Sequence, residues 1–207
     1  MTISPSQITA VILAGGLARR MGGVDKGLQL INGQPMVQHV LQHLHPQVGK
    51  VLINANRHLD EYQQLGLPVC ADIVSGYAGP LSGIHAALMQ TSTPYLVSVP
   101  CDSPQIPLDL VSRLSTEMSG QQADAAVVVT GDEVQRQRHP VFLLLKTELQ
   151  RSLEQYLESG RRKVDDWLES IHCLEVMFED ETAFMNLNTP EDIQALTRIS
   201  GSRPGPG

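Results

Sequence analysis

Residues 9–27 read TAVILAGGLARRMGGVDKG, an apolar run that leads directly into a glycine-rich and basic loop. The run is continuous, partly β-branched and followed by glycines, which is typical of a buried strand. Glycines let the backbone approach a ligand and turn its N–H groups toward phosphate oxygens. Arg20 and Lys26 could neutralise the charge of the same phosphates. This order of strand, glycines and cations predicts a phosphate-binding loop after the first strand.

The loop matches neither of two common phosphate-binding motifs. It has no GxGxxG, the fingerprint of dinucleotide-binding folds, and no GK[ST], which ends a P-loop. The sequence therefore indicates a phosphate-binding loop of another type.

Outward from this loop, short apolar runs alternate with helical patterns along the chain. We expect strands over 9–13, 51–53, 68–70, 95–99, 125–129, 141–145 and 174–178. We expect helices over 36–44, 83–90, 108–118, 146–157, 164–170 and 190–198. Thr189 should cap the last helix, with Asp192 three residues on. This alternation predicts a three-layer, Rossmann-like α/β/α fold with a mostly parallel sheet covered on both faces.

The length of 207 residues fits one large domain better than two. We expect an N-terminal extension over 1–7, a single domain over 8–198 and a disordered tail over 199–207. The tail is too rich in glycine and proline to fold. The chain contains no internal repeat.

The chain is acidic, with a net charge of −7 and a pI of about 5.4. A general nucleic-acid binder normally has a basic face and a high pI, so we expect a small anionic ligand and no nucleic acid. No apolar run approaches the ~18–20 residues that span a bilayer, and residues 1–9 lack the features of a signal peptide. We therefore expect a cytoplasmic protein with no membrane partner.

Cysteine and histidine spacing indicates no zinc site. The three cysteines have no CxxC spacing, which argues against both a disulfide framework and a zinc site. His39 and His43 are four residues apart on an expected helix, but HVLQH lacks the glutamate of HExxH. We interpret this pair as part of a solvated helix face.

Polar residues directly after strands are the candidate ligand-binding residues, because ligands bind at the carboxyl ends of strands in such sheets. Asp102 follows the strand over 95–99 and could hold a Mg²⁺ ion that bridges phosphate oxygens, or could cap a turn. Asp72 follows the strand over 68–70 and could accept hydrogen bonds from a purine or a ribose, or again cap a turn. The glycines within 79–83 would let a base lie against the backbone, although a structural turn explains them nearly as well.

The loop over 13–27, LAGGLARRMGGVDKG, resembles the signature of the molybdenum cofactor guanylyltransferases, the MobA family. The resemblance covers about residues 8–198. The loop alone is shared in looser form with many nucleotidyltransferases, and the whole set of segments is more specific. The other matching segments, in the family's order, are Asn54-Ala55-Asn56-Arg57, Asp72, Gly79-Pro80-Leu81-Ser82-Gly83, Pro100-Cys101-Asp102, His139-Pro140, Gly160-Arg161-Arg162-Lys163-Val164 and Asn186-Leu187-Asn188-Thr189-Pro190.

The resemblance implies a nucleotidyltransferase fold and a magnesium-dependent reaction, for which Mn²⁺ could replace Mg²⁺. GMP would pass from GTP to the terminal phosphate of molybdopterin or its molybdenum form, with release of pyrophosphate. Cofactor-assembly proteins and apo-molybdoenzymes are the protein partners it suggests.

The resemblance also implies roles for individual residues. Arg20, Lys26 and Asp102 would act in catalysis, and Asp102 would hold the metal ion. Arg162, Asn186 and Asn188 would bind molybdopterin. Because two arginines follow Gly160, the resemblance does not decide which basic residue of the run over 161–163 meets the pterin phosphate, and the run could instead be a solvated helix start. The residues matched to GTP binding are Leu13, Ala14, Gly15, Gly16, Lys26, Asn54, Asp72 and Asp102.

The attacking phosphate is already an anion at neutral pH, so we expect no dedicated general base. Catalysis would rest on positioning and electrostatics. Two related activities remain open alternatives: a cytidylyltransferase for the same pterin and a sugar-phosphate nucleotidylyltransferase. A guanine-nucleotide switch is disfavoured because the sequence has no P-loop and no identifiable switch. A purely structural scaffold would leave charged and glycine-rich residues after three strands unexplained.

Overall fold

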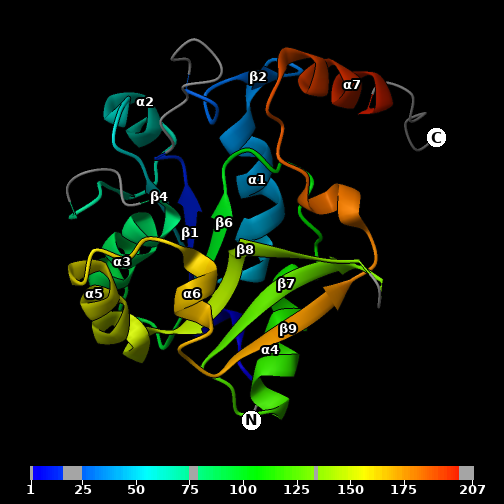
Figure 1. Ribbon diagram of the computed structural model, residues 1–207. Coiled ribbons are helices and arrows are strands. Elements are labelled where there is room, and N and C mark those ends of the chain that lie inside the picture. The colour runs from blue at the N-terminus through cyan, green and yellow to red at the C-terminus, as the bar shows by residue number, and fades with distance from the viewer. Residues whose placement is uncertain (1, 16–24, 75–78, 133–134, 201–207) are drawn as a thin grey trace.

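The computed structural model describes residues 2–15, 25–74, 79–132 and 135–200 of the chain. Within them, a seven-stranded sheet lies between layers of helices (Figure 1). The expected three-layer α/β fold with a mostly parallel sheet is confirmed. No helix in this described part is long and apolar enough to cross a membrane.

The sheet is parallel except at one strand. Its order is β5 (Val69–Cys70), β4 (Lys50–Asn54), β1 (Ile8–Leu13), β6 (Tyr95–Pro100), β8 (Arg136–Lys146), β7 (Ala125–Gly131) and β9 (Cys173–Phe178). Only β8 runs antiparallel to its neighbours β6 and β7 within this sheet of described strands. Leu13 is level with Asn54 and with Pro100, so the carboxyl ends of β4, β1 and β6 form one edge.

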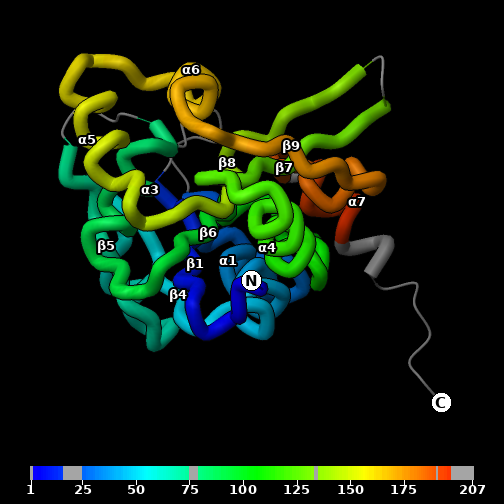
Figure 2. The backbone as a smooth tube through the Cα atoms, turned by 90° about the horizontal axis from the view of Figure 1, so that it is seen from below, coloured from blue at the N-terminus to red at the C-terminus, as the bar shows by residue number. Residues whose placement is uncertain are grey.

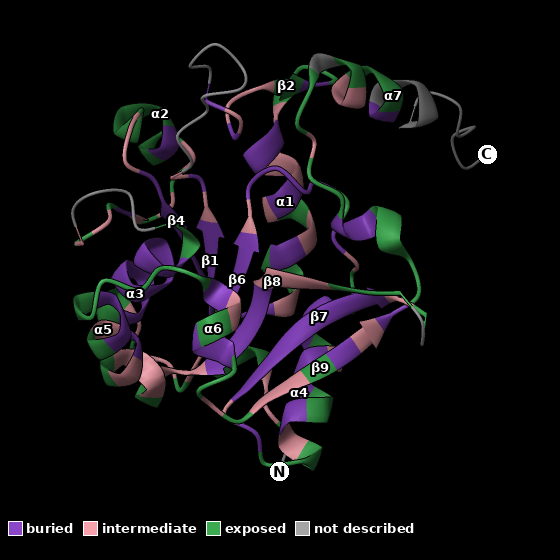
Figure 3. Cartoon of the chain, viewed as in Figure 1, coloured by how far each residue is buried: buried purple, intermediate pink, exposed green. Residues whose placement is uncertain are grey.

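Alternate residues of β1 face two different helical layers. The helices are α1 (Met36–Leu44), α2 (Leu59–Gln63), α3 (Pro80–Gln90), α4 (Leu110–Gly120), α5 (Gln150–Glu158), α6 (Val164–Leu168) and α7 (Pro190–Ser200). Ala10 and Ile12 pack in the core that α1 and α4 cover, whereas Val11 packs in the core that α3, α5 and α6 cover. Figure 2 shows these two groups of helices on opposite sides of the sheet. Figure 3 shows the strands between them mostly buried.

Several elements differ from the sequence expectations. A small hairpin of β2 (Leu30–Ile31) and β3 (Gln34–Pro35) and the helix α2 were not expected, because none of them is long enough to show a period. Strand β8 begins at Arg136 rather than at 141. Its polar first half pairs with β7 through backbone hydrogen bonds, which apolar patterning does not report.

The interpretation of His39 and His43 as a solvated helix face is wrong. Both side chains are partly buried. The His39 ring lies 3.0 Å from the Ile31 carbonyl oxygen, and the His43 ring lies 2.8 Å from the Ile106 carbonyl oxygen. The two rings therefore join α1 to the β2–β3 hairpin and to the chain before α4.

Helix α7 begins at the capping box that the sequence predicts. The Asp192 N–H donates to Thr189 Oγ1 at 3.1 Å, and the Thr189 N–H donates to the Asp192 carboxylate at 2.9 Å. Leu196 of this helix packs on Ile31 and Met36. This contact lays α7 over the hairpin and brings the segment that precedes α7 to the carboxyl edge of the sheet.

Candidate active site

Three side chains from distant parts of the chain meet beyond the carboxyl end of β6. The Lys26 ammonium donates to the Asp102 carboxylate at 2.9 Å and to Asn188 Oδ1 at 2.5 Å. Side-chain exposure is 24% for Lys26 and 12% for Asp102, so the ion pair is partly shielded from water. A shielded pair is screened less by salt than a surface pair, and its charges act more strongly on a ligand.

The strand end and the segment before α7 are joined by backbone as well as side chains. The Leu187 N–H donates to the Asp102 carbonyl at 2.8 Å. Ser103 Oγ donates to Asn186 Oδ1 at 2.8 Å, and Asn188 Nδ2 donates to the Asn186 carbonyl at 3.1 Å. Four of the expected site residues, Lys26, Asp102, Asn186 and Asn188, thus form one connected group.

A second polar group lies at the ends of β4 and β5. Asn54 Nδ2 donates to Asp72 Oδ1 at 3.0 Å and to the Cys70 carbonyl at 3.3 Å. The Asp72 N–H donates to Asn56 Oδ1 at 2.8 Å. Asn56 therefore fixes the backbone of Asp72. This role could not be predicted from the sequence, because it depends on two loops folding side by side.

These two groups face one cavity of about 310 Å³, near the lower end of the range for small-molecule sites. Six expected site residues line it, among them both aspartates. The cavity is lined by Leu13, Gly15, Asn54, Asp72, Gly79, Pro80, Pro100, Asp102, Val141 and Asn186.

A larger cavity of about 610 Å³ adjoins the first and shares Pro100, Val141 and Asn186 with it. One wall is aromatic: the His139 ring centroid lies 5.4 Å from that of Phe184. Burial lowers the pKa of His139, so its ring is mainly neutral at neutral pH. Asn188 lines this second cavity, whereas Asp102 lines the first. The two residues that bind the Lys26 ammonium therefore lie on opposite sides of the shared wall.

Ala14 and the cysteines contribute structure at this edge. The Ala14 N–H donates to the Asn54 carbonyl at 2.8 Å, so we expect any nucleotide contact from Ala14 to use another of its atoms. Burial raises the pKa of Cys70 to about 11 and also raises the pKa of Cys101 well above its ordinary value. Both thiols therefore stay protonated at neutral pH and pack as small apolar groups.

Lys26 and Ala14 reach the site through their hydrogen bonds to Asp102 and Asn54 and do not line either cavity. Three further expected residues have no such link to the site within the described part of the chain. Gly16 and Arg20 lie outside the described residues. Arg162 donates to the Leu157 carbonyl at 2.7 Å within the turn between α5 and α6, and it is absent from the described residues that line either cavity. Its contact with a pterin substrate remains a prediction.

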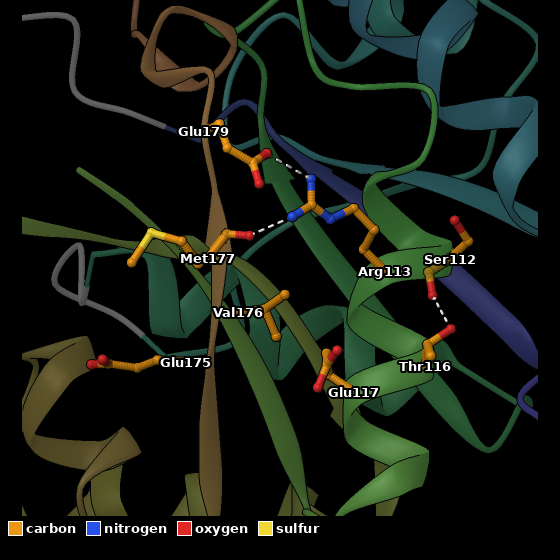
Figure 4. Close-up of a pocket in the computed structure, with 8 residues that line it drawn as sticks. All are labelled: Ser112, Arg113, Thr116, Glu117, Glu175, Val176, Met177 and Glu179. Carbon is orange, nitrogen blue, oxygen red and sulfur yellow. Dashed lines mark hydrogen bonds and ion pairs between the residues drawn. The ribbon is translucent and has the colours of Figure 1, made fainter. Parts of the chain in front are cut away.

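A groove of about 460 Å³ between α4 and β9 has a different character (Figure 4). Arg113 crosses it, donates to the Met177 carbonyl and pairs with Glu179 at 3.4 Å. Its guanidinium also stacks over the Phe178 ring at 4.0 Å. Arg113 therefore fastens α4 to the edge strand, and carboxylates around it make the groove unsuited to a triphosphate.

The site chemistry fits a Mg²⁺ ion held together with a substrate. Within the described residues, no cluster of three or more histidine, cysteine or acidic ligands occurs. Magnesium sites in phosphate-transferring enzymes commonly use one or two carboxylates and complete the coordination with phosphates and water. Asp102, whose carboxylate lines the cavity at the end of β6, is suited to this role.

Comparison with known proteins identifies the family. The model of the MobA-like NTP transferase domain matches residues 10–173. A molybdenum cofactor guanylyltransferase of Bordetella petrii is 48% identical over 94% of this chain and 99% of its own length. One of Ralstonia nicotianae is 49% identical over 94% and 98%. The chain belongs to the MobA family.

Solved structures agree with this MobA-family fold. Molybdopterin-guanine dinucleotide biosynthesis protein A of Archaeoglobus fulgidus superimposes with a TM-score of 0.74 at 22% identity, covering 95% of this chain and all of that one. A 2-C-methyl-D-erythritol 4-phosphate cytidylyltransferase of Thermus thermophilus gives 0.70 at 15% identity, covering 97% and all of that chain. The MobA-family protein described here is a nucleotidyltransferase.

Proposed function

We propose that this enzyme transfers GMP from GTP to the terminal phosphate of molybdopterin or its molybdenum form, with Mg²⁺ as the required ion. Relatives that share nearly half of its residues over nearly its whole length carry the name molybdenum cofactor guanylyltransferase. The geometric observation that carries the proposal is the Lys26–Asp102–Asn188 group, which lies where two adjoining cavities meet. A transferase that joins two phosphate-bearing substrates needs such an arrangement.

The smaller cavity suits the nucleotide. Its wall carries Asp72, whose carboxylate could accept from the N1–H and exocyclic amine of guanine. Asn54 orients that carboxylate through the 3.0 Å hydrogen bond. Adenine has neither the N1–H nor the amine at C2, and a site whose polar groups are left unpaired can reject the wrong base strongly.

The larger cavity suits the acceptor. Asn186 lines both cavities and Asn188 lines the larger one, so their side chains could hold the acceptor phosphate at the shared wall. The aromatic surface of His139 and Phe184 offers a flat face for a ring system. In this proposal Arg162 contributes charge from the turn before α6.

Charge repulsion between two polyanionic substrates is the main obstacle to the reaction. Asp102 would hold Mg²⁺, which offsets charge on the triphosphate when bound. Lys26, on its flexible four-carbon side chain, would donate to the phosphates and stabilise charge on the leaving pyrophosphate. The acceptor phosphate is already ionised, so no residue has to remove a proton. We propose the cytoplasm as the location, and cofactor-assembly proteins and apo-molybdoenzymes as partners on family resemblance.

The test is to incubate the purified protein with Mg²⁺, molybdenum-loaded molybdopterin and, in separate reactions, GTP, CTP or ATP. Pyrophosphate release and the dinucleotide product are measured together. We expect product with GTP alone. Product with CTP would overturn the guanine assignment, and pyrophosphate release that does not depend on molybdopterin would overturn the acceptor assignment.

A further inference from the structure

The segment that leads into Lys26 is fastened to the fold by a buried hydrogen bond. Tyr62, the one fully buried residue of α2, donates its hydroxyl to Asp25 Oδ1 at 2.5 Å. Burial raises the pKa of this tyrosine, so the hydroxyl keeps its proton and acts as the donor. The helix itself is only five residues long, and Tyr62 joins it to the core under α1 and α4.

The same carboxylate oxygen also fixes the residue that follows Lys26. The Gly27 N–H donates to Asp25 Oδ1 at 3.1 Å, and the Gly27 carbonyl accepts from the Val37 N–H at 2.9 Å. A Cβ at position 27 would overlap the Tyr62 hydroxyl, so the backbone lies directly against that side chain. Lys26 is thus held on both sides while its own side chain extends toward Asp102.

A buried carboxylate is costly unless it is hydrogen-bonded, and Asp25 is only 7% exposed. Ordering a long lysine side chain costs conformational entropy. A backbone that is already fixed lowers the entropy that is lost when Lys26 orders against a ligand. Loss of the hydrogen bonds to the Asp25 carboxylate would let the backbone at residues 25–27 shift. A small shift there would move the Lys26 ammonium out of hydrogen-bond range of Asp102.

We propose that Tyr62 and Asp25 are positioning residues that act through Lys26: they hold its backbone so that the ammonium reaches Asp102 and the phosphates of a bound nucleotide. The nucleotide part rests on the proposed function. Asp25 acts here by the acceptor capacity of its oxygen rather than by its charge.

The experiment has two arms, one of which needs no nucleotide. In the first, acetic anhydride labelling of Lys26 is followed by mass spectrometry in the native protein and in Tyr62→Phe, Asp25→Ala and Asp25→Asn. We expect labelling about five-fold faster in Tyr62→Phe and Asp25→Ala, because the ammonium spends less time paired with Asp102. Asp25→Asn should stay near the native rate, since the amide oxygen can accept both hydrogen bonds.

In the second arm, Mg²⁺–GTP binding is measured by calorimetry, with Tyr62→Phe examined both alone and together with Lys26→Ala. We expect about five- to ten-fold weaker binding from Tyr62→Phe alone and less than a two-fold further change in the Lys26→Ala background. Tyr95→Phe is the matched control, because Tyr95 lies at the amino end of β6, away from the site, and this variant should bind as the native protein does.

The outcomes separate the two proposals. Native labelling and native binding in Tyr62→Phe would overturn the positioning role, as would an equal loss of binding in both backgrounds, which would mark a general structural effect. Faster Lys26 labelling in Tyr62→Phe, in a protein whose native form binds no nucleoside triphosphate, would support the positioning of Lys26 and overturn the proposed function.

Discussion

At the residue scale, Asp102 is held at both its side chain and its backbone. The carboxylate accepts from Lys26 and the carbonyl accepts from Leu187, so its direction is set before any ligand binds. We expect Asp102→Ala to lower kcat by about 100-fold or more while the protein stays folded, because the proposed metal ligand and the charge at the phosphates are lost together. Pyrophosphate release with Mg²⁺ measures the first effect and thermal unfolding the second.

The control for this change is Asp109→Ala, an exposed aspartate before α4 whose side chain makes no capping hydrogen bond. It should turn over like the native enzyme. Near-native turnover of Asp102→Ala with Mg²⁺ would remove Asp102 from the metal site.

Lys26 supplies the cation of the group and is the next residue to change. Lys26→Ala should cost roughly 1.5–3 kcal/mol of charged hydrogen bonding, or a loss of roughly 10- to 150-fold in kcat/KM. Lys50→Ala is the comparison, because Lys50 is exposed and lies at the amino end of β4, away from the cavities. A kcat/KM unchanged by Lys26→Ala would exclude this lysine from the phosphate site.

The sequence indicates Asp72 and Asp102 as candidates because each lies just beyond a strand that its apolar pattern reveals. It indicates Lys26 as a cation of the glycine-rich loop that follows the first strand. The hydrogen bonds of Asn56 and Tyr62 could not be predicted in the same way. Asn56 meets Asp72 only when two loops lie side by side, and Tyr62 meets Asp25 through a helix too short to show a period. Contacts between segments distant in sequence decide both roles.

At the element scale, α3 packs unusually close to the ends of β1 and β4. A Cβ on Gly83 would overlap Asn54 Oδ1 and would lie 2.9 Å from Leu13 Cδ2. We expect Gly83→Ala to lower the free energy of unfolding by about 1–3 kcal/mol and to weaken GTP binding, since Asn54 orients Asp72. Urea unfolding and calorimetry measure the two effects.

Gly120 provides the matched substitution at the end of α4, where an added Cβ meets nothing within 4 Å. Gly120→Ala should leave GTP binding unchanged and change stability by less than about 1 kcal/mol. Equal behaviour of the two alanine variants would mean that α3 can shift without disturbing the site.

Local signals account for which elements could be predicted. β1 shows a continuous apolar run, and α7 shows a complete capping box. The polar first half of β8 gives no such signal, because the backbone of β7 holds it in the sheet. That extension matters for the site, since it carries His139 and Pro140 to the wall of the larger cavity.

At the scale of the whole molecule, His139 makes stability depend on pH. Burial lowers its pKa in the folded state below its ordinary value of 6.5, so the unfolded chain binds the proton more readily. The stability that comes from burying the neutral His139 ring is fully present above the pKa of this histidine in the unfolded chain. It is lost as pH falls through its pKa in the folded protein. We expect the free energy of unfolding to fall from about pH 7.5 to about pH 5, and to fall less in His139→Gln.

Urea unfolding at stepped pH measures this difference. His45→Gln, which changes an exposed histidine, should keep the native slope. Identical slopes for the native protein and His139→Gln would show that the ring is not protonated differently in the two states.

The hydrogen bond between Lys26 and Asn188 joins positions 162 residues apart. A ribosome must therefore release residue 188 of 207 before that bond can form. A nascent or prematurely terminated chain can contain the glycine-rich loop and Asp102 yet still lack the residue that joins them to the second cavity. The Lys26–Asp102–Asn188 group consequently forms only after all nine described strands have been synthesised.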